Sequence, residues 1–429
     1  MSRTLDEASL RAVLARPRLA RVLAALAGPG EETRLVGGAV RDALLGRPVA
    51  DIDLATTLLP EETVRRASAA GLKCVPTGIA HGTVTVVIEG EPFEVTTLRE
   101  DVETDGRHAV VRFGRDFARD AGRRDFTINA LSAGPDGRIH DTVEGLADLA
   151  AGRVRFIGEA RQRIREDYLR VLRFFRFHAR YGAGAPDPEG LAAAIEARDG
   201  LALLSRERVR VEILKLLAAP GAPGVTAVLS ETGLLQRLTG GVGDLGRLAR
   251  LAASETEPDA IRRLAALAVR SEGDAERLRE SLRLSKAEHA RLAAYAGAEA
   301  ALHGTRDTLS PADVRRLVAV HGAEAAADAA LVLAGEPRPV LAPEAAALLA
   351  RFAAGAEPVP ALPVTGAALV AAGARPGRGL GRGLAAARRA WLAEGCPTDA
   401  AARERLHALA LAATAGTGED AARSPRCMN

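Results

Sequence analysis

The sequence predicts an α+β protein. A small N-terminal head, with a mixed or antiparallel sheet and flanking helices, precedes an all-α neck, body and tail. Three observations lead to this prediction. Short β-rich runs alternate with helical ones between residue 33 and about residue 100. Two of these runs, residues 82–90 and 91–99, are joined by so short a turn that they must be antiparallel. From residue 160 onward the chain is rich in Ala, Leu and Arg, which indicates helices.

The elements of the head follow from local signals. Residues 1–28 predict a helix that ends at the Gly-Pro-Gly of residues 28–30. Residues 33–38 predict a strand that runs into a turn, and residues 39–46 a helix closed by Gly46. Residues 50–56 predict a strand, and residues 60–71 a helix that starts at Pro60. Residues 99–116 are charged and irregular, which predicts a mobile loop.

Changes in composition divide the chain into six predicted segments. These are an N-terminal helical segment (1–30), the head (31–135), a neck (136–200), a helical body (201–310), a helical tail (311–418) and a disordered C-terminus (419–429).

Composition excludes several classes of protein. No run approaches the roughly 18 apolar residues of a membrane span, and the N-terminus lacks the apolar stretch of a secretory signal, so we expect a cytoplasmic protein. The three cysteines are far apart and form no CxxC, which excludes a disulfide scaffold or a thiolate zinc site. None of the eight histidines begins an HExxH motif. Any metal must therefore be held by carboxylates.

Charge is concentrated in one segment. The net charge of the whole chain is only +3, yet residues 161–180 contain seven arginines against Glu166 and Asp167. Such a local excess of positive charge indicates a polyanion or phosphates as a ligand.

Asp51 and Asp53 form an Asp-x-Asp pair in a predicted strand. Side chains alternate between the faces of a strand, so both carboxylates project from one side while Ile52 points into the core. Two hard oxygen ligands on one face suit one or two Mg²⁺ ions, which complete their shells with water and phosphate oxygens. An isolated pair of this kind also fits two surface aspartates on an edge strand.

Gly37 and Gly38 stand upstream of this pair, where a strand ends and a helix begins. Free amides at a helix start bind phosphate, and glycine lets the backbone approach a triphosphate without interference from a Cβ atom. Arg41, in the first helical turn, can add a charge-assisted contact. Because most Gly-Gly pairs are only turns, this feature alone leaves the function open.

Three motifs in order carry a family resemblance. GGAVRDALLG (37–46) followed by DID (51–53), RRDFTINAL (123–131) and EDYLRVLRFFRF (166–177) resemble the class II template-independent nucleotidyltransferases of the DNA polymerase beta superfamily. This group comprises CCA-adding tRNA nucleotidyltransferases and bacterial poly(A) polymerases. The resemblance implies a nucleotidyltransferase head, Mg²⁺ at Asp51 and Asp53, and CTP and ATP as substrates.

The third motif is implied to select the nucleotide. Asp167, Arg170, Arg173 and Arg176 recur every three residues on a predicted helix whose other positions are mostly apolar, a pattern that an ordinary amphipathic helix also shows. A carboxylate accepts and a guanidinium donates hydrogen bonds, so an Asp-Arg pair matches the Watson–Crick edges of C and A and rejects U and G. The resemblance gives this role to Asp167 and Arg170, places Arg173 and Arg176 near base or triphosphate, and adds Arg124 to the nucleotide site.

A third catalytic carboxylate is expected at Glu94. It lies on the strand predicted beside Asp51 and Asp53, and relatives in the superfamily often use three carboxylates. An exposed strand glutamate is the alternative interpretation. Asp125 and Asn129, in the second motif, fit either the nucleotide site or a structural role.

The loop at Arg99–Phe113 and the third motif resemble tRNA-repair enzymes more than poly(A) polymerases. We therefore expect template-independent addition of CCA to tRNA by a bacterial type of enzyme without an HD domain. The body is expected to bind tRNA by its shape, with Arg206, Arg208, Arg210 and Lys215 as candidates, and no obligate protein partner is evident. A bacterial poly(A) polymerase and a catalytically inactive RNA-binding protein remain as alternatives.

Overall fold

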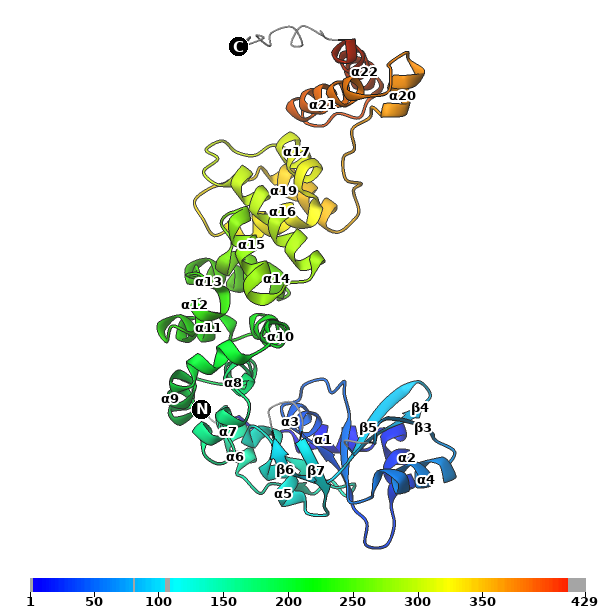
Figure 1. The fold of residues 1–429 in the computed structure, drawn as a ribbon, viewed down its shortest axis with the longest axis vertical. Coiled ribbons are helices and arrows are strands. Elements are labelled where there is room, and N and C mark those ends of the chain that lie inside the picture. The colour runs from blue at the N-terminus through cyan, green and yellow to red at the C-terminus, as the bar shows by residue number, and fades with distance from the viewer. Residues whose placement is uncertain (1–2, 80–81, 105–108, 416–429) are drawn as a thin grey trace, which may run out of the picture. The chain divides into compact units, whose positions relative to one another are not determined.

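The computed structural model describes residues 3–79, 82–104 and 109–415, in two compact units, Met1–Leu238 and Thr239–Asn429 (Figure 1). The predicted disordered segment 419–429 lies outside the described residues. The N-terminal unit contains a sheet with flanking helices followed by helices alone, and the second unit is helical throughout its described part, as the sequence predicts.

The head begins with two helices rather than the single predicted one. Pro17 occupies the first turn of the second helix, and the preceding Arg16 is extended, which breaks the chain between them. The further elements of the head are β1 (Thr33–Val36), α3 (Gly38–Leu44), β2 (Asp53–Thr56), α4 (Pro60–Ala69), β3 (Lys73–Gly78), β4 (Thr83–Ile88), β5 (Glu91–Thr97), β6 (Arg99–Thr104), β7 (Ala109–Phe113), α5 (Phe117–Gly122), the 3-10 turn η2 (Thr127–Asn129), β8 (Ser132–Ala133) and β9 (Ile139–His140), after α1 (Glu7–Leu14) and α2 (Pro17–Leu26).

Among the described residues, seven strands form one sheet in the order β3-β4-β5-β2-β1-β8-β9. Strands β2 and β5 are parallel, and the other neighbouring pairs are antiparallel, including β4 and β5 as predicted. The parallel pairing sets Asp53 opposite Glu94. The sheet therefore brings these two predicted carboxylates together from distant parts of the sequence.

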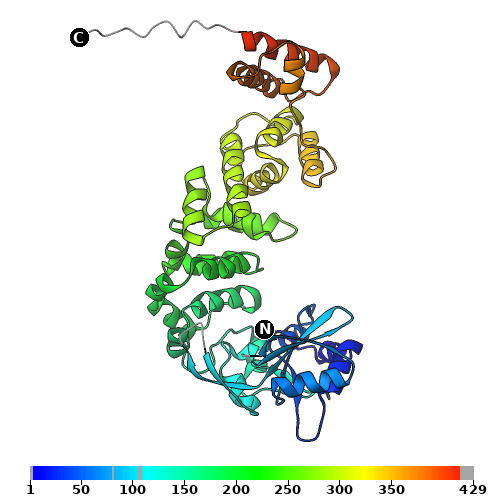
Figure 2. The ribbon, with the colours of Figure 1, turned by 45° about the vertical axis from the view of Figure 1, so that its right-hand side comes forward.

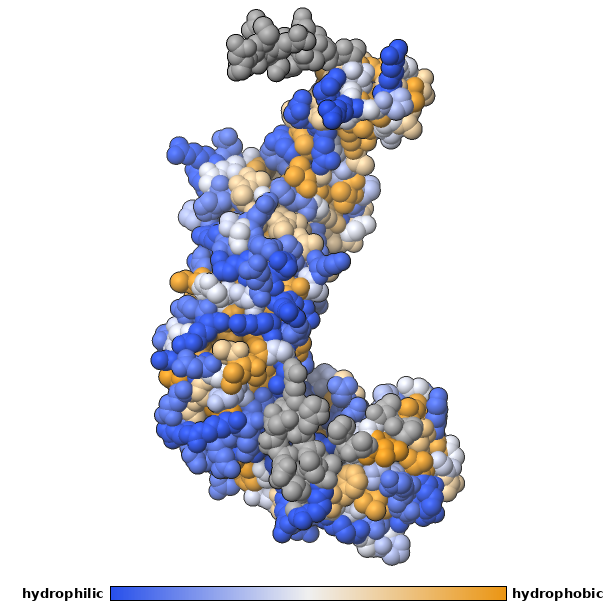
Figure 3. Space-filling view, in the orientation of Figure 1, coloured by the Kyte–Doolittle hydropathy of each residue, from blue (hydrophilic) through white to orange (hydrophobic). Residues whose placement is uncertain are grey.

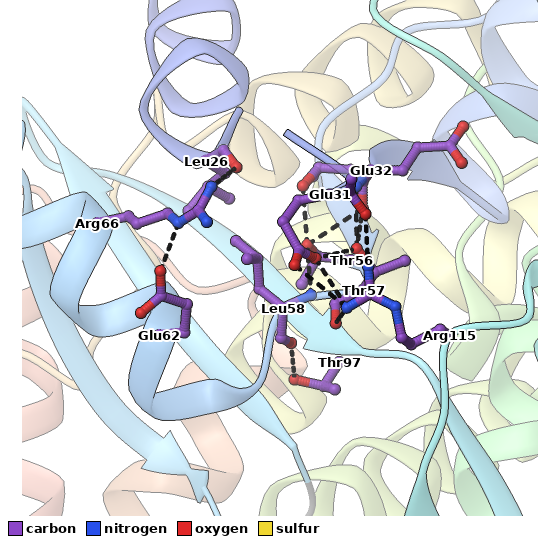
Figure 4. A network of polar contacts seen from close by, with 12 residues as sticks. Leu26, Glu31, Glu32, Thr56, Thr57, Leu58, Glu62, Arg66, Thr97 and Arg115 are labelled. Carbon is purple, nitrogen blue, oxygen red and sulfur yellow. Dashed lines mark hydrogen bonds and ion pairs between the residues drawn. The ribbon is translucent and has the colours of Figure 1, made fainter. Parts of the chain in front are cut away.

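Helices α2 and α4 lie side by side beside the sheet (Figures 1 and 2). Figure 4 shows how they are joined: Arg66 of α4 donates to the carbonyl oxygens of Leu26 and Ala27 at the end of α2, at 3.3 and 3.0 Å. Glu62, one turn earlier on α4, holds the Arg66 guanidinium at 2.6 Å. The last carbonyls of α2 thus receive a cation, which suits the negative end of a helix.

The segment predicted as a mobile loop contains an antiparallel pair, β6 and β7, in the residues that are described. Gly114 donates to the Leu98 carbonyl at 2.7 Å, which closes the base of this pair. Arg115 contacts Glu31, just before β1, at 3.1 Å, and the carbonyl of Thr57, just after β2 (Figure 4). The two strands are thereby attached to the head at their base.

The helical part of the first unit follows. It consists of α6 (Gly145–Ala151), α7 (Ala160–Glu166), α8 (Leu169–Tyr181), α9 (Pro188–Glu196), the 3-10 segment η3 (Arg198–Leu203), α10 (Arg206–Leu217), α11 (Ala222–Glu231) and α12 (Leu234–Thr239). Its core includes a cluster of aromatic rings in tilted contact: Phe126 lies 4.9 Å from Phe156 and 5.1 Å from Phe177 between ring centroids. This cluster packs the second sequence motif against α8, which carries the third.

The second unit contains the remaining helices. These are α13 (Leu245–Ser254), α14 (Ala260–Ala268), α15 (Glu272–Leu282), α16 (Lys286–Leu302), α17 (Pro311–His321), α18 (Ala323–Leu333), α19 (Pro343–Ala353), α20 (Gly366–Ala371), α21 (Arg378–Ala393) and α22 (Ala400–Ala415). In the part of the chain that the structure describes, no helix has the length and apolar character needed to cross a membrane. The face in Figure 3 is largely hydrophilic, with hydrophobic residues interspersed.

Candidate active site

A cavity of about 780 Å³ in the first unit collects most of the predicted site residues. Arginines and aspartates make up most of its lining. The lining residues are Gly37, Gly38, Arg41, Asp51, Asp53, Arg123, Arg124, Asp125, Asn129, Asp167, Leu169, Arg170, Arg173, Arg176, Phe177 and Arg208. Of the predicted site residues, only Glu94 lies outside this lining; it lines a smaller adjoining cavity, which shares Asp53 and Arg124 with the large one.

The Gly37–Gly38 turn joins β1 to α3 as predicted. Gly37 has φ +65° and ψ −121°, a conformation that residues with a side chain rarely adopt. A Cβ atom on Gly37 would also lie 2.7 Å from Nη1 of Arg124. Glycine is therefore required both by the turn and by the close approach of this arginine.

Asp51 and Asp53 both present exposed side chains at the cavity, while Ile52 between them is buried. The alternation is that of a strand, although β2 begins only at Asp53 and Asp51 lies in the irregular segment before it. The side chain of Asp53 is solvent-accessible, but the surrounding protein partly encloses its carboxylate. This partial burial is the main cause that raises the pKa of Asp53, the nearby carboxylates of Glu94 and Asp51 raise it further, and Arg124 opposes the shift. A cation beside these carboxylates would relieve their repulsion.

The donor set is compatible with a metal held by two carboxylates. Within the described ranges, no group of three or more His, Cys, Asp or Glu residues is arranged to hold a metal ion. Glu94 is the register partner of Asp53 but does not complete such a group. The fit to Mg²⁺ thus rests on Asp51 and Asp53, because Mg²⁺ commonly takes one or two protein carboxylates together with water and phosphate oxygens.

Arg41 lies at the cavity wall, but its guanidinium is directed into the protein. The residue is only 6% exposed. It donates to Asp42 at 3.0 Å, to the Tyr181 hydroxyl at 2.6 Å and to the Asn129 side-chain oxygen. The sequence placed Arg41 in the nucleotide site, and its contacts here are with protein groups.

Asp125 and Asn129 form a buried connection between the head and α8. The Asn129 amide donates to Asp125 at 2.9 Å, and Arg173 donates to the other oxygen of Asp125 through Nε and Nη2, at 2.7 and 2.5 Å. Burial opposes ionisation of Asp125, but Arg173 and Asn129 outweigh it and keep its pKa below the ordinary value. Both residues thus have a defined structural partner at the cavity wall.

Asp167 does not lie on the helix that the sequence predicts. Helix α7 ends at Glu166 and α8 starts at Leu169, so Asp167 occupies an extended position between them. One of its oxygens accepts from the Leu169 amide at 3.0 Å, and the other accepts from Arg208 of α10 at 2.7 Å. Arg208 was predicted among the tRNA-binding residues of the body, and the structure places it in this cavity.

The three predicted site arginines of α8 are each paired with a carboxylate. Arg170 donates to Glu166 at 2.5 Å and to the Arg163 carbonyl at 2.7 Å. Arg176 donates to Glu212 of α10 at 2.5 Å. Together with the contact between Arg173 and Asp125, these pairs neutralise the repulsion expected for like charges on one helix. The sequence interpretation missed Glu212 and Tyr181, which contact Arg176 and Arg41, and it named Arg208 only as a candidate for tRNA binding.

Two family models match parts of the chain. Residues 33–155 match the poly A polymerase head domain, and residues 185–240 match a probable RNA and SrmB-binding site of polymerase A.

Individual proteins resemble the chain over longer stretches. It is 44% identical over 264 residues to a mitochondrial CCA tRNA nucleotidyltransferase 1 of Danio rerio, an alignment that covers 60% of this chain and 61% of the relative. It is 41% identical over 232 residues to a CCA-adding enzyme of Geobacillus stearothermophilus, covering 53% and 56%. The chain thus spans less than two thirds of these curated relatives.

A solved structure matches over nearly the whole length. The CCA-adding enzyme of Bacillus stearothermophilus in complex with CTP has a TM-score of 0.66 and 30% sequence identity, and the match covers 95% of this chain and 93% of the other. The similarity therefore extends over both units of the chain.

Proposed function

The chain belongs to the family of class II CCA-adding tRNA nucleotidyltransferases, and from this premise we propose that it adds C, C and A to the 3′ end of tRNA. In each step the terminal 3′-hydroxyl of the RNA attacks the α-phosphorus of CTP or ATP. A phosphodiester bond forms, and pyrophosphate leaves. The observation that carries the proposal is that one cavity gathers the Asp-x-Asp pair, the Gly-Gly turn and the Asp167–Arg170 pair.

We assign the chemical step to Asp51 and Asp53. Nucleotidyltransferases of this type typically depend on a metal, and two exposed carboxylates that repel each other suit one. When bound, Mg²⁺ would supply positive charge to the hydroxyl and the α-phosphate. Glu94, opposite Asp53 in the sheet, is the proposed third carboxylate and acts by adding negative charge beside the pair.

The triphosphate is assigned to the Gly37–Gly38 turn and Arg124. The glycines allow the backbone to come close to the phosphates, and the Arg124 guanidinium lies beside Gly37. Arg173 and Arg176 line the same cavity and add positive charge. This grouping of donors suits an anion with many acceptor oxygens.

The base is assigned to Asp167 and Arg170. Asp167 accepts from the amino group of C or A, and Arg170 donates to the neighbouring ring nitrogen. U and G present the opposite order of donor and acceptor, which would leave buried groups unpaired. Selection of C and A then needs no nucleic-acid template.

For tRNA we propose the helical body as the binding region, with Arg206, Arg210 and Lys215 of α10 as candidate contacts. The proposed compartment is the cytoplasm, although the zebrafish relative is named as a mitochondrial protein. Cell fractionation with an antibody to the chain checks this assignment.

A bacterial poly(A) polymerase is the second candidate, because the family model of the head carries that name. The two functions differ in the product. The test supplies a tRNA that lacks its CCA end with labelled CTP, ATP, UTP or GTP, singly and in mixture, and then sizes the RNA on a gel. We expect two C residues with CTP alone and three added residues with CTP and ATP together.

Long A tracts without C incorporation would contradict the proposal and support the polymerase. Asp51→Ala should abolish all addition while circular dichroism shows an unchanged fold. Retained addition by this variant would contradict the metal assignment. A wild-type chain that binds tRNA but adds no nucleotide would indicate an inactive RNA-binding protein.

A further inference from the structure

In the first unit, a buried contact between Arg41 and Tyr181 joins α3 to α8, and we call it the Arg41–Tyr181 joint. In the proposed function, these two elements bind opposite ends of the nucleotide. Arg41 stands in the first turns of α3, directly after the Gly37–Gly38 turn. Tyr181 is the last residue of α8, the helix that begins beside Asp167. Both side chains are nearly inaccessible, with exposures of 6% for Arg41 and 4% for Tyr181.

The contact between them is both stacked and hydrogen-bonded. The Arg41 guanidinium carbon lies 4.0 Å from the centre of the Tyr181 ring, and Nη2 donates to the hydroxyl at 2.6 Å. A guanidinium on an aromatic face is favourable, the more so when it is removed from water. Asp42 holds the same guanidinium from the side, at 3.0 and 3.1 Å.

The Tyr181 end of α8 is fixed to the head by further contacts. Arg3 donates to the Tyr181 carbonyl at 2.8 Å, and Arg47 donates to the Arg180 carbonyl at 3.2 Å. The Arg47 guanidinium also lies 4.9 Å from the centre of the Tyr181 ring. The C-terminal end of α8 thus receives several cations, which matches the negative end of its dipole.

Arg41 continues this connection toward the cavity. It donates to Asn129, which donates to Asp125, and Asp125 accepts from Arg173 in the middle of α8. Helix α3 is therefore tied to α8 at two places, directly through Tyr181 and indirectly through Asp125. Two such points fix both the distance and the angle between the elements.

We propose that the Arg41–Tyr181 joint is a positioning device that sets the spacing between the phosphate-binding turn and the base-reading end of α8. The inference rests on the proposed function. Neither residue needs to touch the nucleotide. A ligand that binds at two sites gains affinity only if both contacts form at the same time. Simultaneous contact requires the correct spacing between the two sites.

This role makes a prediction that a direct contact does not. A substitution that loosens the Arg41–Tyr181 joint should weaken the binding of CTP and leave the binding of its separate parts unchanged. The parts are cytidine, which engages the base site, and tripolyphosphate, which engages the phosphate site. A phosphate contact by Arg41 would instead weaken tripolyphosphate as much as CTP.

The experiment measures binding of labelled CTP to the full chain by equilibrium dialysis with Mg²⁺ and without tRNA, so that no transfer occurs. Unlabelled cytidine and tripolyphosphate compete in separate series. For Tyr181→Leu we expect a CTP Kd raised about tenfold, within the range that small misplacements cause, with both competition constants unchanged within about twofold. Tyr181→Phe retains the ring and loses the hydroxyl, so its CTP Kd should rise less.

Tyr295→Phe is the matched control. Tyr295 is also buried, but it belongs to α16 of the other unit, and its hydroxyl has no hydrogen-bond partner among the described residues. Removal of the Tyr295 hydroxyl should leave the CTP Kd and the competition constants of cytidine and tripolyphosphate at their wild-type values. If Tyr181→Leu does not fold, Tyr181→Phe and Arg41→Lys carry the same test.

Two outcomes would overturn the joint: an unchanged CTP Kd, or equal weakening of CTP and tripolyphosphate. The assay of addition to tRNA is separate. A chain that binds CTP but adds no C or A removes the proposed function and still allows the joint to be measured. A chain that adds CCA normally but shows either overturning outcome removes only the joint.

Discussion

At the scale of single residues, Asp167 is held as an acceptor by two donors. The Leu169 amide binds one oxygen and Arg208 binds the other. Donors on both oxygens fix the orientation of the carboxylate and so the directions of its remaining lone pairs. Arg208, on a different helix, thereby becomes part of the proposed base-reading site without having to contact the base.

We therefore predict that Arg208→Ala relaxes the choice of nucleotide. Loss of one charge-assisted hydrogen bond of about 1.5–3 kcal/mol should lower the ratio of kcat/KM for CTP over UTP by about ten- to a hundredfold. Single-nucleotide addition to tRNA measures this ratio. Lys215→Ala, an exposed position on the same helix α10, is the control and should leave the ratio unchanged. A ratio unaltered by Arg208→Ala would show that Asp167 is oriented by other groups.

His178 gives a pH dependence with a defined sign. Burial lowers its pKa, and the bond of Nε2 with the Gly184 carbonyl opposes the shift only in part. The unfolded chain therefore binds a proton that the folded chain does not, so stability is complete above the unfolded pKa of about 6.5 and falls as the pH drops below it.

The measurement compares thermal unfolding midpoints of wild type and His178→Leu at about pH 7.5 and pH 5.5, on either side of the ordinary histidine pKa. Acidification should lower the wild-type midpoint more than that of the variant. The pKa values of His140 and His321 are also lowered, and both residues remain in the two proteins, so the difference reports His178. Equal losses in both proteins would contradict the prediction.

The sequence motifs and their family resemblance predicted most of the side chains that line the cavity but not how they pair. Ile52 is buried between two exposed aspartates because a strand alternates, and that rule needs only local sequence. Tyr181 meets Arg41 across 140 positions, and Arg208 meets Asp167 across 41. Such pairs depend on how helices pack, and no spacing in the sequence indicates them.

At the scale of elements, the turn between β1 and α3 is the most constrained connection at the site. Gly37→Ala should strain the backbone by about 1–3 kcal/mol, because its φ and ψ lie outside the regions open to alanine. The new Cβ atom would also displace the Arg124 guanidinium. We expect a lower unfolding midpoint together with a CTP Kd raised about tenfold, since Arg124 leaves its position beside the turn.

Gly71→Ala separates these two effects. Gly71 also has a positive φ, of +73°, but a Cβ atom there would meet no other atom within 4 Å. This variant should lower the midpoint and leave the CTP Kd unchanged in the same titration. A Gly37→Ala variant that binds CTP normally would contradict the placement of the triphosphate at the turn.

Two of the features that the sequence failed to predict are not marked by the usual local signals. The break between α7 and α8 contains no Gly or Pro; the Asp167 side chain instead bonds to the Leu169 amide and competes with helix continuation. Strands β6 and β7 lack the apolar alternation of a half-buried strand, because they pair with each other outside the main sheet. In both cases the hydrophobic pattern of the sequence does not indicate the local structure.

At the scale of the whole molecule, the proposed nucleotide site lies within one unit, whereas the proposed tRNA-binding body extends over both. All residues assigned to CTP or ATP belong to Met1–Leu238. The sequence predicted a head followed by a helical region because the amino-acid composition changes along the chain. The order of the elements and the matching solved structure confirm this fold class. The unit boundary at residue 238 falls within the stretch predicted as a single body, whose helices look alike in sequence.

We predict that a fragment ending at Gly243, just beyond α12, binds CTP as the full chain does. Its CTP Kd should stay within about threefold of the full-chain value, because the cavity walls come from one unit. Binding of tRNA should weaken in part, because the fragment keeps Arg206, Arg210 and Lys215 of α10 but loses residues 244–310 of the proposed tRNA-binding body. The tRNA Kd of the fragment should also depend less steeply on salt, because each lost phosphate contact lowers the slope.

Calorimetric titration of CTP and filter binding of tRNA at two salt concentrations measure both effects, with circular dichroism as the check on folding. A folded fragment that fails to bind CTP would mean that the second unit shapes the cavity, and one that binds tRNA with the full-chain affinity and salt slope would place the whole RNA interface on the first unit.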